Sequence, residues 1–273
     1  MAKPTETSSP KKAPEIFSKG RSYIFGTPIA WIAIYAALIA VTSFVPILPY
    51  AGGGGYWTLA YILTAVAPLV LGVVPGCVAG IVGTLIGMFI TPVVYPLGIM
   101  NVFDTGLMPA LYFGLAFNMK KYWKYFIPVH LLETAGMFTY LFIYPGVSGG
   151  WAGVNTNTFF IYTLWYWLVP LVLLVSPVGR KYIYEWSRSN SLKLRSIGIF
   201  IGALLCWNAF YATSGYWFYW LVFAFPAPLL NVMYWGVYSW YDVVFAVVMT
   251  IFAAPVLNAL SKSGYAKLRD ALW

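Results

Sequence analysis

The chain has little of what most enzyme sites are built from. It contains one histidine, two cysteines and seven acidic residues among 273 residues. Both cysteines, Cys77 and Cys206, lie inside apolar segments, so neither a disulfide framework nor a zinc cluster is indicated. Phosphate-binding P-loop and CxxC motifs are also absent from the sequence. We therefore expect a protein that is not an enzyme, with no catalytic residues, no metal site and no cofactor.

Charge is scarce as well. Only 8% of the residues are charged, 61% are hydrophobic, and the mean hydropathy is +0.78. This composition excludes an ordinary soluble domain. All sixteen Lys and Arg residues fall in four short clusters, at 3–21, 120–124, 180–195 and 262–269, and the chain between the clusters carries no positive charge.

The clusters predict a membrane topology. Lys and Arg near the ends of spanning helices stay in the cytoplasm, so each gap between clusters must cross the membrane an even number of times. A crossing needs ~20 apolar residues. The gaps therefore accommodate four, two and two helices. We expect an all-α, multi-pass protein of the cell membrane with eight transmembrane helices and both termini cytoplasmic. The net charge of +9 is explained by this topology and by attraction to anionic membrane lipid, and nucleic acid is not an expected partner.

This topology divides the chain into four parts. Residues 1–22 form a disordered cytoplasmic tail, 23–179 a six-helix membrane bundle, and 180–196 an amphipathic cytoplasmic connector. Residues 197–273 add two further helices. The aromatic segment 215–236 lies between these two helices, and we expect it to be an interfacial or re-entrant element. The predicted helices are 28–48, 57–74, 77–90, 103–118, 125–144, 159–175, 197–213 and 237–260.

Apart from tyrosines and cysteines, four ionisable side chains fall within the predicted spans. Charge at the bilayer centre costs ~2.5–3.5 kcal/mol or more, so such residues usually face a cavity or a partner. Glu133 is expected about 14 Å deep at ~1.5 Å per residue, on the same helical face as His130. The two are either a structural pair that ties neighbouring helices together or, for Glu133, part of a ligand site. Asp104 and Asp242 are expected near the outer surface, Asp104 as a helix N-cap or a ligand contact and Asp242 as an interface anchor.

Small residues recur at helical spacing. The glycines Gly72, Gly76, Gly80, Gly83 and Gly87 predict close helix packing, because a small-xxx-small pattern lets backbones approach. In the first helix Ala33 pairs with Ala37, and Ala36 pairs with Ala40, at i, i+4. These alanines either pack inside the protein or form a docking face for another membrane subunit.

Residues 28–179 resemble the substrate-binding S component of energy-coupling factor transporters. The resemblance is carried by six helices with both ends inside, by the AxxxA spacing of residues 33–40, and by the glycine-rich hairpin of residues 67–80. A loop at 52–55 follows the first helix, and the basic end 118–121 closes the fourth.

The resemblance implies a substrate-binding subunit of a vitamin-type or small-solute importer. A separate transmembrane coupling protein and ATPase subunits would be its partners. The expected substrate contacts are Asp104, Glu133, Trp151, Asn155 and Trp165. The alternative that the residues leave open is a non-catalytic structural subunit of a larger membrane complex.

Overall fold

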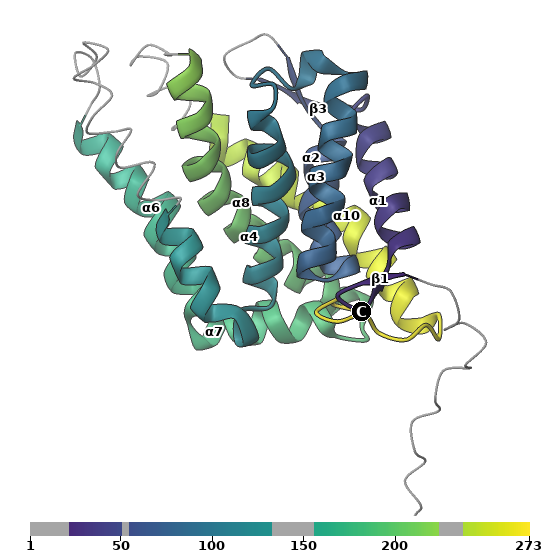
Figure 1. The fold of residues 1–273 in the computed structure, drawn as a ribbon. Helices are drawn as coiled ribbons and strands as arrows, with labels where there is room; N and C mark the ends of the chain where they lie inside the picture. The colour runs from purple at the N-terminus through teal and green to yellow at the C-terminus, as the bar shows by residue number, and fades with distance from the viewer. Residues whose placement is uncertain (1–21, 51–54, 133–155, 224–236) are drawn as a thin grey trace, which may run out of the picture.

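The computed structural model describes residues 22–50, 55–132, 156–223 and 237–273, and these are mostly helical. Figure 1 shows the helices lying side by side as a bundle. The helices are α1 (Ile29–Thr42), α2 (Leu59–Leu71), α3 (Val73–Ile90), α4 (Met108–Phe117), α6 (Thr156–Val175), α7 (Pro177–Gly179), α8 (Leu192–Phe223) and α10 (Tyr238–Lys262), with a further helical stretch at 119–132. Short 3₁₀ or π segments are η2 (Pro92–Val94), η3 (Val102–Leu107), η4 (Arg180–Glu185) and η5 (Trp186–Arg188).

Three helical segments in the described part are long and apolar enough to cross a membrane: Val73–Ile90, Leu192–Phe210 and Trp240–Lys262. Four shorter apolar segments accompany them, at Ile29–Thr42, Leu59–Leu71, Val102–Phe117 and Trp165–Val175. The structure is therefore mostly helical and has helices of membrane-spanning length, as the composition predicted. Eight crossings and a cytoplasmic position for both termini remain predictions.

Two small antiparallel hairpins lie at opposite ends of the bundle, as Figure 1 shows from the positions of β1 and β3. β1 (Tyr23–Ile24) pairs with β2 (Thr27–Pro28), and β3 (Pro46–Pro49) pairs with β4 (Tyr56–Thr58). The sequence predicted neither hairpin. The second one ends the first helix at Thr42, six residues earlier than expected from 28–48.

The turn between α2 and α3 lies at Gly72 and not at Pro75-Gly76, where the sequence predicted it. Gly72 has φ = 93°, a conformation that glycine adopts without strain. A Cβ atom there would also lie 2.1 Å from the carbonyl oxygen of Arg269. Pro75 falls in the first turn of α3, where a missing amide proton is tolerated.

The C-terminal end of α2 is capped by groups from distant parts of the chain. The last four carbonyls of a helix lack donors within the helix. Here the Pro68 carbonyl accepts from the Gly72 amide. The next three accept from the Leu272 amide, from Trp273 Nε1 and from Thr27 Oγ1, at 2.9, 2.8 and 2.8 Å. The segments before α1 and after α10 are therefore fastened to the same helix end.

The described parts of the basic clusters gather at this same end. Lys121 Nζ donates to Asp270 Oδ1 at 2.6 Å, and Asn118 Nδ2 donates to the Asp270 carbonyl at 3.1 Å. Arg188 donates to Asn118 Oδ1 at 2.6 Å and to the Phe117 carbonyl at 3.0 Å, which caps α4. The hydrogen bond to Asp270 raises the pKa of Lys121, and burial lowers the pKa of Arg188 to about 10. One end of the bundle is therefore closed by a polar network.

Helix α8 is longer at both ends than the predicted helix 197–213. It begins at Leu192, within the predicted connector, and runs to Phe223. Nine residues of the element predicted at 215–236 therefore continue a helix, and 224–236 lie outside the described residues. Packing explains the early start, because the buried Arg195 guanidinium donates to Ser261 Oγ at 3.1 Å and joins α8 to α10.

Candidate functional site

Asp104 is the most unusual of the predicted site residues. It lies inside the π-helical segment η3 and is fully buried. Neither of its carboxylate oxygens accepts a hydrogen bond in the described structure. The N-cap interpretation is therefore wrong, because η3 starts after Asn101 and Asp104 is an interior residue that caps nothing. Irregular π segments inside helices occur frequently at functional sites.

The neighbouring polar groups do not neutralise Asp104. Asn101 accepts from the Leu97 amide at 2.8 Å and donates to Thr105 Oγ1 at 3.2 Å. Thr84, which faces η3 across the contact between α3 and Gly106, keeps a buried hydroxyl without a hydrogen-bond partner in the described part. Thr84 on α3 and Asp104 on η3 are thus two buried polar side chains without a hydrogen-bond partner in the described structure.

Asp242 is a second buried carboxylate, on the first turns of α10. The sequence placed it near the outer surface as an interface anchor, but it is 1% exposed and neither oxygen has a hydrogen-bond partner among the described residues. Its neighbour Tyr241 points to another part of the chain, because its hydroxyl donates to the Pro49 carbonyl at 2.7 Å. The sequence marks Asp242 as a charged residue within an apolar span. It does not show whether the side chain points into the bundle or away from it.

Aromatic rings fill the bundle between α2, α8 and α10. Trp57 lies 4.7 Å from Tyr61, Tyr61 lies 4.8 Å from Trp207, and Trp207 lies 5.2 Å from Phe245, as measured between ring centroids. All four residues are buried. Rings at these separations are in contact, so this part of the bundle is packed core and supplies a rigid wall.

His130 joins three helices. Its Nδ1 atom is hydrogen-bonded to the Tyr112 hydroxyl of α4 at 2.8 Å. Its ring stacks on Trp167 of α6, with centroids 6.2 Å apart and planes 13° from parallel. His130 therefore ties neighbouring helices together, whereas its pairing with Glu133 stays a prediction. Its predicted neighbour Glu133 lies outside the described residues.

Of the other four predicted substrate contacts, the structure describes Trp165 alone. Trp151 and Asn155 lie outside the described residues, as Glu133 does. Trp165 on α6 is 56% exposed, whereas Asp104 is fully buried. Of the five predicted contacts, Asp104 is the one that the described structure places in a buried polar setting.

The four alanines of α1 divide between two faces. Ala36 and Ala40 are buried, and the Ala36 carbonyl lies 2.7 Å from where a Gly83 Cβ atom would be. They therefore pack inside the protein against α3, so the prediction that all four form one docking face is wrong. Ala33 and Ala37 are exposed, and these two alone remain available to a partner.

The predicted glycines line the helix contacts of α3. A Cβ atom at Gly76 would lie 2.5 Å from the Pro68 backbone, and at Gly80 it would lie 2.3 Å from the Gly106 carbonyl oxygen. At Gly87 it would meet Ser43 Oγ at 2.6 Å. These separations are far below van der Waals contact, so the helices are as close as glycine allows.

No group of three or more potential metal ligands is found among the described residues. Comparison with protein-family models, with curated proteins and with solved structures finds no match for this chain.

Proposed function

We propose that this protein is the substrate-binding integral membrane subunit of a small-solute importer of the vitamin-uptake type, and that separate coupling and ATPase subunits drive it. The observation that carries the proposal is Asp104, a fully buried carboxylate without a hydrogen-bond partner in the described part of the chain. A charged group in such a place is strongly unfavourable unless it is neutral or paired. A bound solute with an amine or N–H edge would pair it.

The position of Asp104 supports access from the outer side. Asp104 lies roughly 20 Å along the helix axis from Asn118, at ~1.5 Å per residue. Asn118 belongs to the network that closes the basic end of the bundle. If the basic end is cytoplasmic, as the positive-inside rule requires, the carboxylate lies toward the outer surface and the inner end is shut.

The test is native mass spectrometry of the gently solubilised protein, which detects small molecules that co-purify with it. The wild-type chain should carry a small polar solute, and Asp104→Asn, which keeps the shape and removes the charge, should lose it. Glu185→Gln is the matched control, because Glu185 is an exposed carboxylate on η4. Retention of the solute by a folded Asp104→Asn variant would refute the role of Asp104.

The second candidate is a non-catalytic structural subunit of a membrane complex, and the exposed face of α1 favours a partner in either case. Ala33 and Ala37 are exposed beside Ile34, Leu38 and Val41, whose side chains are 46–69% exposed.

Co-purification of the native complex tests this docking face. Ala33→Trp should release a partner while the isolated chain keeps its melting temperature, since the added ring points away from the protein. Ala36→Trp should instead destabilise the chain itself, because the buried site has no room. A complex that stays intact with Ala33→Trp excludes this face as the docking surface. A solute-free protein that still binds its partners through Ala33 would favour the structural subunit.

A further inference from the structure

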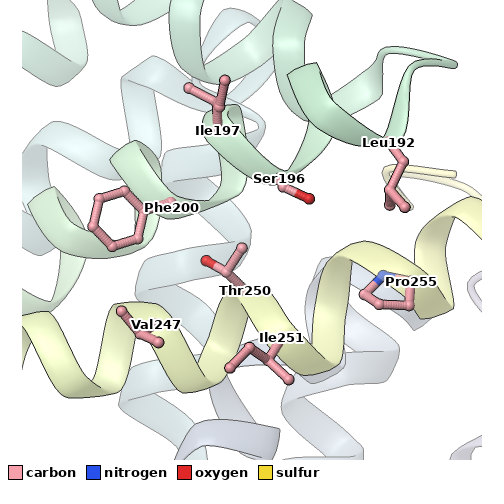
Figure 2. A pocket seen from close by; sticks show the side chains of 8 residues that line it. All are labelled: Leu192, Ser196, Ile197, Phe200, Val247, Thr250, Ile251 and Pro255. Carbon is pink, nitrogen blue, oxygen red and sulfur yellow. The ribbon is translucent and has the colours of Figure 1, made fainter.

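An apolar groove runs between α8 and α10 at the surface of the bundle, with a volume of about 510 Å³. Figure 2 shows its lining side chains, which come from both helices. The lining residues are Leu192, Ser196, Ile197, Phe200, Val247, Thr250, Ile251 and Pro255. The Thr250 hydroxyl donates to the Ala246 carbonyl of its own helix at 2.6 Å, so a bound molecule does not have to accept its proton.

The length of the groove along the helix axis is close to the thickness of one membrane leaflet. From Leu192 to Phe200 the α8 wall extends about 12 Å, at ~1.5 Å per residue. The hydrocarbon core of a bilayer is ~30 Å thick, so each leaflet contributes about half of that. The α8 wall begins at Leu192, the first residue of the helix, and the α10 wall begins at Pro255, about 10 Å from Lys262 at ~1.5 Å per residue. The groove therefore follows the inner leaflet.

Two lysines extend the walls at the basic end. Lys193 precedes Ser196 and Ile197 by three and four residues, and Lys262 follows Pro255 by seven, so helical spacing places each lysine on the groove face of its helix. Both are exposed. Ion pairs in the described part of the chain involve Lys121 and Arg269 with Asp270, and neither includes these two lysines.

We propose that this groove binds one anionic glycerophospholipid of the inner leaflet, with an acyl chain between α8 and α10 and the headgroup phosphate at Lys193 and Lys262. The inference rests on the membrane embedding that is part of the proposed function, and it does not depend on Asp104. Ser196, the polar side chain nearest the mouth on the α8 wall, lies where the glycerol ester of such a lipid would be. The Arg195–Ser261 hydrogen bond fixes the two walls together at the mouth.

The charge at the mouth favours a lipid over another helix. The apolar lining would suit a second spanning helix. However, Lys193 and Lys262 would then face the apolar surface of that helix, which offers no partner for their charges. An anionic headgroup complements both lysines, and basic residues at the inner surface attract such lipids.

The experiment titrates the full chain in detergent with dioleoyl phosphatidylglycerol or dioleoyl phosphatidylcholine and counts bound lipids by native mass spectrometry. The two lipids have the same acyl chains and differ in headgroup charge. The wild-type protein should prefer the anionic lipid by about tenfold or more, as expected for two lysines near the surface. Lys193→Gln combined with Lys262→Gln should abolish the preference, and Ser196→Leu, which fills the groove, should weaken binding of both lipids.

The matched control is Lys120→Gln combined with Lys124→Gln, which removes two exposed lysines at the same end but away from the groove. This pair should leave the preference intact. An equal loss in the control would show diffuse surface attraction and overturn the proposal. A dimer in the mass spectrum that Ser196→Leu dissociates, with lipid binding unchanged, would assign the groove to a second copy. Absence of a preference in a chain shown to cross the membrane would refute the lipid site alone.

Discussion

Replacement of Thr27 by valine tests whether the capping of α2 stabilises the fold. Thr27 is fully buried, and its hydroxyl donates at 2.8 Å to the carbonyl of Leu71, the last residue of α2. Valine has nearly the same shape, so packing is retained while the donor is lost. A hydrogen bond contributes about 0.5–1.5 kcal/mol, and a buried acceptor left without its donor costs ~1–3 kcal/mol. We therefore expect Thr27→Val to lower the free energy of unfolding by about 1–3 kcal/mol.

Thr64→Val is the matched control for Thr27→Val. Thr64 is equally buried, but its hydroxyl donates to the Ala60 carbonyl of its own helix at 2.9 Å. That carbonyl is four residues back, in the first turn of α2, and keeps its place in the helical ladder, so the change should stay within about 0.5 kcal/mol.

Thermal unfolding of the purified chain in detergent measures both variants. A loss of 1 kcal/mol lowers Tm by about 2–4 °C in a protein of this size class. The Tm of the Thr27→Val variant should therefore fall by roughly 3–10 °C, and the Tm of the Thr64→Val variant should fall by much less. Equal shifts in the two variants would refute the argument, because they would show that the carbonyls at the end of α2 do not depend on Thr27.

Two further predictions concern packing and topology. Gly80→Ala should lower the free energy of unfolding by about 1–2 kcal/mol, since the clash with the Gly106 carbonyl oxygen outweighs the helix propensity that alanine gains. Val82→Leu, at a half-exposed position of α3, is the control and should change it little. A Gly80→Ala variant of unchanged stability would show that η3 moves easily. In sealed cells an impermeant thiol reagent should label Gly53→Cys and spare Lys120→Cys, and labelling of Lys120→Cys from outside would overturn the cytoplasmic assignment of the basic end.

The sequence predicted the fold best where the signal was charge or hydrophobic length. The basic residues at 120–124, 180–195 and 262–269 lie at one end of the bundle, and apolar helices occupy the gaps between them. Helix ends were predicted less well, because they depend on distant contacts. Gly72 ends α2 where the Arg269 carbonyl approaches, and α8 starts at Leu192 where Arg195 reaches Ser261. Neither contact is encoded in the local pattern.

The candidate site was predictable in part for a similar reason. A carboxylate in an apolar span marks Asp104 and Asp242 as unusual, and both are buried without a hydrogen-bond partner in the described part of the chain. The sequence does not specify rotation about the helix axis. It therefore gave Asp242 the role of an interface anchor although its side chain is buried, and it grouped Ala36 and Ala40 with Ala33 and Ala37 although α3 covers the first pair.

The two ends of the bundle differ in a way that suits one-sided binding. At the basic end, Asp270 accepts from Lys121 and from Tyr122, each at 2.6 Å, so its charge is paired. Asp104 and Asp242 have no such donors, because the described cations lie at the other end. A folded chain that leaves two carboxylates buried and unpaired gives up stability unless they are protonated or a ligand completes them. The proposed importer subunit explains this pattern, since a solute with N–H groups would supply the missing donors from the outer side while the basic end stays closed.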